Sequence, residues 1–252
     1  MNTLIFTALP GIPFVRRGDD LAEIILHAVS RARIGLKDGD IFVVAQKVVS
    51  RAEGRLVDLR TITPSAEAQT LAAKVEKDPR LVELILRESN AVLRAVPGVL
   101  IVEHKLGFVC ANAGIDHSNV CGDDECVLLL PENPDRSAAQ LRARLEEASG
   151  KRLGVVINDS HGRAWRLGTV GVTIGISGVP ALVDVRGRHD LVGRELRTTQ
   201  IGAADELAAA ASLLMGQAAE GIPVVHVRGF PYPLRESGLQ ELIRPKEKDL
   251  FR

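Results

Sequence analysis

The stretch VVINDSHGRAWRLG, residues 155–168, is the part of the sequence that decides how the fold is interpreted. Its apolar run, Val155 to Ile157, predicts a buried strand, and polar residues replace that run from Asn158 onward. Side chains that follow buried strands often form ligand sites, although a polar turn capped by Asp159 is the plainer alternative. Other segments that place polar side chains directly after a strand therefore decide between the two interpretations.

The composition is that of a globular protein, with 46% hydrophobic and 25% charged residues in a chain of 252. The formal net charge is zero and aromatic residues make up 3%, which argues against a general nucleic-acid binder. The sequence contains no signal peptide and no apolar stretch of roughly 18 residues, so it predicts a cytoplasmic protein without a membrane span. The three cysteines, an odd number, argue against a disulfide framework, and no Cys or His pair completes a zinc site.

The order of the predicted elements favours an α+β fold with a mixed sheet over a doubly wound sheet, because strands and helices do not alternate strictly. The elements form one unit or two interleaved lobes. The segments predicted as helices are 19–35, 64–77, 79–89, 137–150 and 204–218. The segments predicted as strands are 41–45, 47–59, 90–104, 106–111, 127–130, 155–157, 170–185 and 221–229.

Four segments place polar side chains just past an apolar strand or helix. Asp116 follows GFVCA, Asp159 and Ser160 follow GVVIN, and two further segments contribute Gln46 with Lys47 and Gln217 with Glu220. A hard cation such as Mg²⁺ or Mn²⁺ prefers oxygen ligands, usually one or two carboxylates with phosphates and water. Asp116 and Asp159 are therefore candidate metal ligands, and a turn or capping role is the alternative for each.

Basic side chains near these segments suggest an anionic substrate. Arg163 and Arg166 follow Asp159 closely, and a guanidinium group matches the oxygens of a phosphate. For any single arginine, an exposed surface position is the simpler interpretation. The sequence has no P-loop or kinase motif, so a nucleotide would be held in another way. His117 and His161, next to the two aspartates, are interpreted as supporting or surface residues.

Taken together, these segments resemble the coenzyme F-420-0:L-glutamate ligases. The resemblance extends over residues 9–229 and rests on seven motifs in order: LPGIPFVRRGDDL, DGDIFVVAQKVVSRAEGR, ANAGIDHSNV, LLLPENPDRSA, VVINDSHGRAWRLGTVGVTIGISG, DLVGREL and ADELAAAASLLMGQAAEGIPVVHVRG. Larger relatives in this family carry an additional nitroreductase-like domain, for which this chain is too short. We therefore expect a single catalytic domain, residues 1–252.

The resemblance implies an activity, its cofactors and its partners. The family joins L-glutamate to the carboxylate of F-420-0 through an acyl phosphate, converts GTP to GDP and phosphate, and in some cases adds further gamma-linked glutamates. This chemistry belongs to coenzyme F-420 biosynthesis. The resemblance also implies two divalent cations, Mg²⁺ or Mn²⁺, assistance by K⁺, the family's own α+β fold and a homodimer. The partners are then small molecules only: F-420-0, L-glutamate and GTP.

The resemblance also assigns roles to residues that match the family's motifs. Asp116 and Asp159 are the implied catalytic residues and hold one metal, while Ser160 and Gln217 border a second. Gln217 replaces a glutamate of some relatives, and its amide is a weaker ligand than a carboxylate. The residues implied for GTP binding are Ile12, Pro13, Phe14, Val15, Gln46, Lys47, Arg51, Asn119, Met215, Gly216, Gln217, Ala218, Ala219, Glu220, Gly221 and Ile222.

Two other functions stay open at this point. One is a metal-assisted, nucleotide-dependent amide ligase that acts on a different carboxylate, because substrate contacts cannot be identified from one sequence. The other is a nucleotide-binding module without catalysis. Phosphate release from GTP that requires both F-420-0 and glutamate distinguishes the first function from these two.

Overall fold

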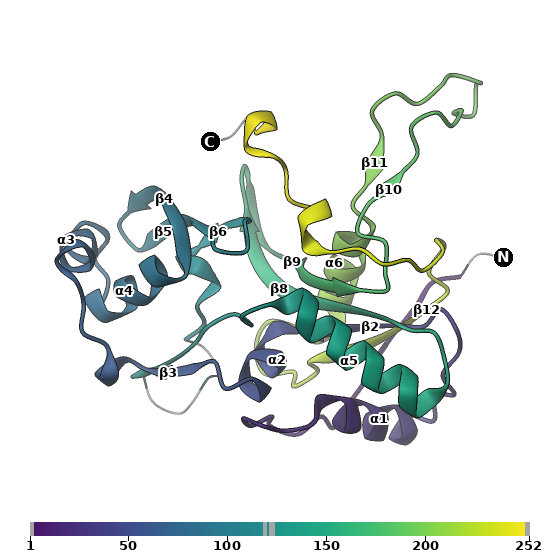
Figure 1. The fold of residues 1–252 in the computed structure, drawn as a ribbon, viewed down its shortest axis with the longest axis horizontal. Helices are drawn as coiled ribbons and strands as arrows, with labels where there is room; N and C mark the ends of the chain where they lie inside the picture. The colour runs from purple at the N-terminus through teal and green to yellow at the C-terminus, as the bar shows by residue number, and fades with distance from the viewer. Residues whose placement is uncertain (1–2, 118–119, 121–123, 250–252) are drawn as a thin grey trace.

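The structure is a computed structural model that describes residues 3–117, 120 and 124–249 (Figure 1). The α-helices are α1 (Leu21–Arg31), α2 (Gln46–Ala52), α3 (Ala66–Val75), α4 (Pro79–Arg87), α5 (Pro134–Ser149) and α6 (Ala203–Met215). The strands are β1 (Ile5–Ala8), β2 (Ile41–Ala45), β3 (Leu56–Asp58), β4 (Ser89–Val96), β5 (Val99–His104), β6 (Val109–Ala111), β7 (Cys126–Leu128), β8 (Gly154–Arg163), β9 (Arg166–Ser177), β10 (Val183–Asp184), β11 (Gln200–Ile201) and β12 (Val224–Arg228). Helices and mixed sheets confirm the predicted α+β class. No helix in the described ranges has the length and apolar character that crossing a membrane requires.

The central sheet has five strands in the order β1-β12-β2-β8-β9. Its only parallel pair in the described chain is β2 with β8, with Ile41 opposite Gly154 and Ala45 opposite Asn158. All other neighbours in this sheet are antiparallel. Because β2 and β8 run in the same direction, the residues that follow them emerge at the same edge of the sheet.

Helices cover both faces of this sheet, as Figure 1 shows. Phe42 and Val44 of β2 pack against α1 and α5 on one face, whereas Ile41 and Val43 pack against α6 on the other. This alternation is the two-residue period of a strand whose two faces are both buried. The ribbon places α1 and α5 on the near side of the sheet and α6 on the far side.

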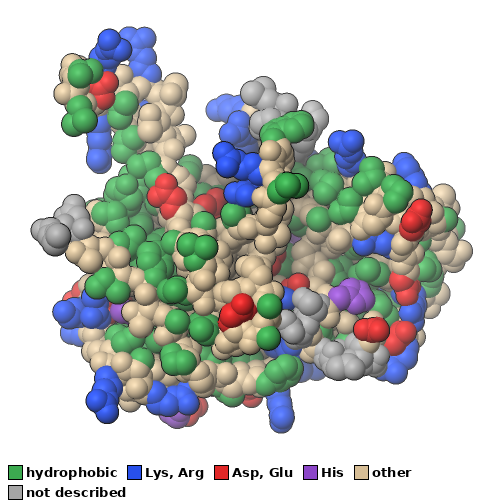
Figure 2. Space-filling view, turned by 180° about the vertical axis from the view of Figure 1, so that it is seen from behind, with side chains coloured by type: hydrophobic (Ala, Val, Ile, Leu, Met, Phe, Trp, Pro, Cys, Tyr) green, Lys and Arg blue, Asp and Glu red, His purple; other side chains and the backbone are tan. Residues whose placement is uncertain are grey.

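A second lobe lies at one end of the central sheet. It consists of the three-stranded sheet β4-β5-β6 with α3 and α4 packed against it, around a core that includes Val82, Ile85 and Leu100. The chain also extends an arm, residues 183–201, from the opposite side, and β10 and β11 form the base of this arm (Figure 1). Figure 2 shows the arm standing clear of the body, with basic side chains near its tip.

Two sequence predictions about these elements are wrong. The first part of the strand predicted over 47–59 is instead helical: residues 47–52 belong to α2, whose Val48 and Val49 enter the core beside α1. The run 155–157 was expected to end its strand at Asn158, but β8 continues to Arg163 and pairs with β9. In both cases a tertiary contact outweighs the local pattern. Helix α5 also begins three residues before the predicted cap, because Asn133 accepts the Arg136 N–H and Pro134 takes the first helical position.

The cysteine prediction also needs correction. The odd number of cysteines argued against disulfides, but Cys126 is disulfide-bonded. Cys110 is a free, buried thiol, and burial raises its pKa to about 12. Cys110 is therefore a core side chain rather than a nucleophile.

The hairpin β8–β9 contains a β-bulge just before the polar residues of interest. Ile157 pairs with Gly175 and Asn158 pairs with Thr173, so Ile174 is the additional residue on β9.

Strand β9 is an edge strand, and carboxylates from both helical layers accept its free N–H groups. Asp205 of α6 accepts the Thr173 N–H at 2.9 Å, and Asp135 of α5 accepts the Ile176 N–H at 2.8 Å. These bonds satisfy an edge that would otherwise be open.

At the other end of β2, the buried carboxylate of Asp40 joins the start of this strand to β12. Asp40 accepts two hydrogen bonds from the Arg228 guanidinium, at 2.8 and 2.6 Å, and its Oδ2 lies 2.9 Å from His226 Nε2. Burial raises the pKa of Asp40, but the hydrogen bonds from Arg228 and His226 outweigh it and leave the pKa below its ordinary value. This cluster joins β12 to the start of β2, at the end of the strands opposite the predicted site.

We expect Asp40→Asn to lower the free energy of unfolding by about 3 kcal/mol, because it leaves Arg228 and the buried His226 without their anionic partner. Urea denaturation at pH 7 measures this change. The matched control is Glu132→Gln, which removes an exposed ion pair with Arg136 and should cost less than about 1 kcal/mol. Equal stability of the two variants would contradict the role given to Asp40.

Close packing of α6 on the sheet yields a second prediction. A Cβ atom on Gly171 would lie 2.4 Å from the Ala208 carbonyl oxygen and 2.6 Å from Asn158 Oδ1. We expect Gly171→Ala to cost about 1–3 kcal/mol, measured by thermal or urea unfolding. Gly162→Ala in the same hairpin is the control, since a Cβ there meets nothing within 4 Å. A Gly171→Ala protein as stable as this control would show that α6 does not approach the sheet so closely.

Candidate functional site

The site begins where the parallel strands β2 and β8 end. Gln46 and Lys47 start α2 immediately after β2, and Asn158 lies opposite Ala45 at the corresponding point of β8. Asp159 and Ser160 therefore come next to the first turn of α2. Alternation along β8 directs Asp159 and Ser160 to opposite faces, and Asn158 donates a hydrogen bond to the sulfur of Met215 on the α6 side.

Asp116 reaches the same place from the second lobe. Its backbone bridges to Leu128, which fixes the segment that follows β6. Its carboxylate accepts a hydrogen bond from Gln46 Nε2 at 2.5 Å and lies 3.3 Å from Lys47 Nζ. Gln46 is itself buried and accepts from Ser50 at 2.9 Å, so its amide orientation is fixed. Two residues of α2 thus hold a carboxylate that is 70 positions away in the sequence.

The two aspartates interact with each other. The pKa of Asp116 is raised to about 6, because burial and the nearby negative charge of Asp159 raise it more than Lys47 and Gln46 lower it. Two carboxylates held near each other with one ammonium group form a site that favours additional positive charge. The electrostatics of this site are therefore those of a cation-binding position.

Ser160 and Gln217 lie together on the other flank. Ser160 Oγ donates to Gln217 Oε1 at 2.8 Å. Gln217 belongs to the turn that follows α6, where Gly216 has a positive φ of 72° and Glu220 accepts the Ala218 N–H at 2.9 Å. A side chain at Gly216 would collide with Glu220, so this tight turn requires glycine.

Two adjoining cavities open between these segments. The smaller, of about 120 Å³, is lined by polar side chains that include Gln46, Lys47, Asp159, Ser160, Gln217 and Glu220. The larger, of about 710 Å³, is lined mainly by the loop before α1, by α2 and by the turn after α6; its walls include Ile12, Pro13, Phe14, Val15, Lys47, Arg51, Met215, Gly216, Ala218, Ala219, Gly221 and Ile222. Both cavities share the wall formed by Ala45, Lys47 and the turn after α6. A polar pocket thus adjoins a larger and more apolar one, the usual composition of a ligand site.

Arg51 marks the far side of the larger cavity. Its guanidinium lies 4.0 Å from the centre of the Phe14 ring and donates to the Val120 carbonyl oxygen at 2.8 Å. Burial lowers the pKa of Arg51 below its ordinary value, which leaves it a cation at neutral pH. The cavity therefore has basic side chains, Lys47 and Arg51, along one wall.

The structure brings together the predicted site residues that it describes, although it does not test the roles assigned to them. Asn119 lies outside the described residues. Arg163 and Arg166 lie at the far end of the β8–β9 hairpin, where Arg163 donates to the Leu167 carbonyl oxygen, and they line neither cavity. The hypothesis that these two arginines meet an anionic substrate therefore gains no support within one chain.

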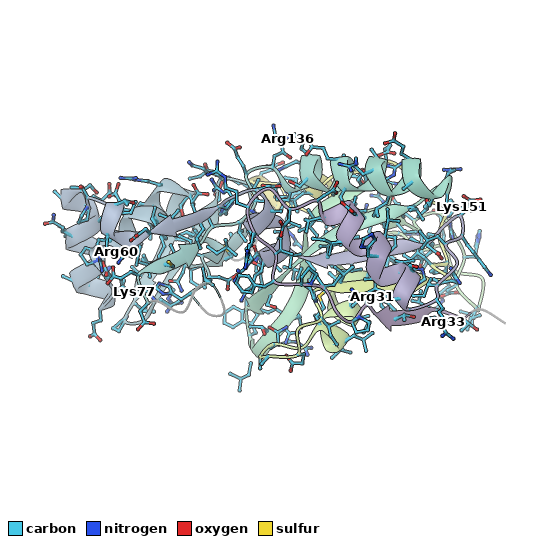
Figure 3. The ribbon with its side chains drawn as sticks, turned by 90° about the horizontal axis from the view of Figure 1, so that it is seen from below. Arg31, Arg33, Arg60, Lys77, Arg136 and Lys151 are labelled. Carbon is cyan, nitrogen blue, oxygen red and sulfur yellow. The ribbon has the colours of Figure 1, made fainter. Side chains whose placement is uncertain are left out.

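Basic side chains elsewhere are spread over the surface. Figure 3 labels six of them at separate places around the molecule rather than in one cluster: Arg31, Arg33, Arg60, Lys77, Arg136 and Lys151. The basic wall of the larger cavity is thus a local feature in a chain with zero formal net charge.

An aromatic stack lies beside Asp159 and was not predicted from the sequence. The His104 ring stacks on Phe108 with centroids 5.1 Å apart, and Phe108 contacts the ring of His161 at 5.2 Å. His104 and Phe108 flank a turn between β5 and β6, and no sequence motif relates them to residue 161. The two-residue spacing of Asp159 and His161 was a usable signal, since it predicts a shared face once β8 is extended to Arg163.

The donors at this site fit a hard divalent cation. Asp116 and Asp159 supply carboxylate oxygens, and Ser160 and Gln217 supply neutral oxygens. Within the described residues, no cluster of three or more His, Cys, Asp or Glu side chains forms a ready metal site. Such a set suits Mg²⁺ or Mn²⁺, which retain water or substrate oxygens as further ligands, and does not suit zinc.

Comparison with known proteins identifies the family of this chain. The sequence profile described as F420-0:gamma-glutamyl ligase matches residues 11–229. This chain belongs to the F420-0:gamma-glutamyl ligase family. The match spans the cavities, both aspartates and the turn after α6, so the family's shared region contains the whole candidate site. The family resemblance inferred from seven sequence motifs is thereby confirmed.

Individual relatives in this family are similar over nearly their whole length. The chain is 49% identical to coenzyme F420:L-glutamate ligase of Methanopyrus kandleri over 256 residues, covering 100% of this chain and 99% of the relative. It is 48% identical to the protein of the same name from Methanothermobacter thermautotrophicus, with 96% of each chain covered. The Archaeoglobus fulgidus protein of that name is 47% identical over 242 residues.

The stack beside Asp159 predicts a pH dependence of stability. Burial lowers the pKa of His104 to about 4, and its Nδ1 accepts the Leu106 N–H at 3.0 Å, which requires a neutral ring. The unfolded chain binds a proton near pH 6.5 and the folded chain does not, so stability falls as the pH drops from about 6.5 toward 4. At pH 5 this histidine should cost about 2 kcal/mol relative to pH 7.5.

We expect His104→Asn to remove that part of the pH dependence, because asparagine keeps an acceptor for Leu106 and does not titrate. Urea denaturation of both proteins at pH 7.5 and pH 5 measures it. If the difference between the two pH values is the same in the variant as in the wild type, the assignment to His104 is wrong.

Proposed function

We propose that this protein is a ligase that joins L-glutamate to the carboxylate of coenzyme F-420-0 and uses GTP and a divalent cation. The relatives named coenzyme F420:L-glutamate ligase support the substrates. The observation that carries the proposal is the placement of Asp116 and Asp159, from distant parts of the sequence, around Lys47. Lys47 lies 3.3 Å from Asp116, lines the polar cavity with Asp159, and also lines the larger cavity of about 710 Å³.

The proposed reaction has two steps. A carboxylate oxygen of F-420-0 attacks the γ-phosphorus of GTP, the bond from that phosphorus to the bridging oxygen breaks, and GDP leaves. The amine of glutamate then attacks the acyl carbon of the resulting acyl phosphate, loses a proton, and expels phosphate to form the amide. Both steps bring several negatively charged groups together, so the protein contributes mainly by positioning reactants and balancing charge.

The residues of the larger cavity are placed to hold the nucleotide. Lys47 and Arg51 offer cations to phosphate oxygens, and the turn of residues 216–222 forms part of the cavity wall. Phe14, which is exposed and lies under Arg51, presents an aromatic face to a bound ligand. The preference for GTP over ATP is inherited from the resemblance, because the sequence shows no base-reading motif.

Asp116 and Asp159 would hold one divalent cation, and Ser160 with Gln217 would border a second. When bound, such a cation neutralises phosphate oxygens and stabilises the charge that develops during phosphoryl transfer. Lys47 already neutralises part of the charge on Asp116, so it is placed to exchange its partner for a phosphate oxygen when a metal binds. The effect of K⁺ stays a prediction.

We also propose a homodimer in which a second copy covers the arm of residues 183–201. The arm exposes Leu191 and Val192, which a single chain leaves in contact with water. Light scattering coupled to size exclusion would detect this assembly, and a monomer at micromolar concentration would contradict it.

We expect Asp159→Asn to reduce kcat/KM at least on the order of 100-fold, as the loss of one charge-stabilising group at the reacting phosphate commonly does. The assay measures the glutamylated product by mass spectrometry after incubation with F-420-0, glutamate, GTP and Mn²⁺. Glu132→Gln, at an exposed residue that lines neither cavity, serves as the control.

The same assay decides among the functions that the sequence left open. Phosphate release that requires F-420-0 and glutamate together supports the proposal. Release with a different acid would indicate another carboxylate ligase, and tight GTP binding without turnover would indicate a nucleotide-binding module. Normal turnover by Asp159→Asn would remove that residue from the mechanism.

A further inference from the structure

His161 makes a directed contact with the candidate metal ligand Asp159. Its Nε2 lies 2.9 Å from Asp159 Oδ2. A carboxylate can only accept, so the imidazole N–H is the donor. Both side chains are on the same face of β8 and each is only 11% exposed, so water competes weakly for this bond. The bond occupies one carboxylate oxygen and leaves Oδ1 for another partner.

The orientation of the His161 ring is fixed from behind. Phe108 packs against the ring, and His104 stacks on Phe108 with an interplanar angle of 6°. His104 is in turn held by the Leu106 N–H and is almost fully buried. Three rings from the second lobe and the central sheet therefore form one column that ends at Asp159.

We propose that His161 is a positioning residue: its N–H holds Asp159 in the rotamer that presents Oδ1 to the cation shared with Asp116. This inference rests on the proposed function, because it takes Asp159 to be a metal ligand. Without the donor, the Asp159 side chain could rotate or offer both oxygens, and Lys47 or water would compete for them. Ligands that are oriented by such outer hydrogen bonds typically lose about 10- to 100-fold in metal affinity when the bond is removed.

Two substitutions at position 161 separate the donor from the ring. His161→Phe keeps an aromatic ring against Phe108 and removes the N–H. His161→Gln loses the ring but keeps an N–H donor, because the amide nitrogen of glutamine and the Nε2 of histidine are both four bonds from Cα. His27→Phe, at an exposed position of α1 that lines neither of the two cavities, is the control for a histidine-to-phenylalanine exchange.

The probe is Mn²⁺ alone, titrated into the full chain at pH 7.5, with free Mn²⁺ measured by its electron paramagnetic resonance signal. We expect His161→Phe to weaken Mn²⁺ binding about 10- to 100-fold, and His161→Gln to stay within about 3-fold of the wild type. In the ligase assay, His161→Phe should raise the KM for Mn²⁺ and recover most of its kcat at saturating Mn²⁺. Thermal unfolding of each variant verifies that it is folded.

Three results would overturn the inference. If His161→Phe binds Mn²⁺ like the wild type, the hydrogen bond does not position Asp159. If His161→Gln is as weak as His161→Phe, the imidazole itself is needed, as a ring or as a direct ligand. If Asp159→Asn also binds Mn²⁺ like the wild type, the metal assignment fails together with the inference. Loss of binding in Asp159→Asn but not in His161→Phe would overturn the inference and leave the proposed function intact.

Discussion

The backbone hydrogen bonds between β2 and β8 form the parallel pair on which the rest of the site depends. With Ala45 opposite Asn158, the first turn of α2 and the polar end of β8 must leave the sheet side by side. Gln46 and Lys47 then reach Asp116 in the second lobe, and the charge of Asp159 acts on the same carboxylate. A shift of this register by one residue would exchange the two faces of β8 and separate these groups.

Carboxylates and a β-bulge stabilise the sheet on both sides of the β2–β8 pair. The bulge at Ile174 bends β9 next to Asn158, and Asp205 and Asp135 accept the N–H groups that the edge strand cannot pair within the sheet. At the end of the strands away from the site, the contacts of Asp40 with His226 and Arg228 fix the start of β2. These contacts secure the sheet at the edge strand β9 and at the start of β2. Two negatively charged carboxylates near each other lower the stability of the fold, and the surrounding polar contacts offset this cost.

Sequence patterns predicted the α+β class and most helices, because these depend on local periodicity and caps. The site residues came mainly from the family resemblance; their roles stay a prediction, although those that the structure describes lie around the two adjoining cavities. The patterns did not predict α2, whose valines favour a strand locally but are buried by α1 and α5 as a helix. They also ended β8 too early, since nothing in the polar residues 158–163 shows that β9 would pair with them. The stack of His104 and Phe108 against His161 was out of reach for the same reason: it joins two lobes through contacts that have no sequence period.

The central claim is that Asp116 and Asp159 share one cation next to the nucleotide cavity. Crystals of the protein grown with GDP and Mn²⁺, and measured at the manganese absorption edge, test it directly. The account predicts an anomalous peak between the two carboxylates, about 2–2.3 Å from an oxygen of each. A manganese peak bound elsewhere, with Asp116 and Asp159 turned away from each other, would contradict it.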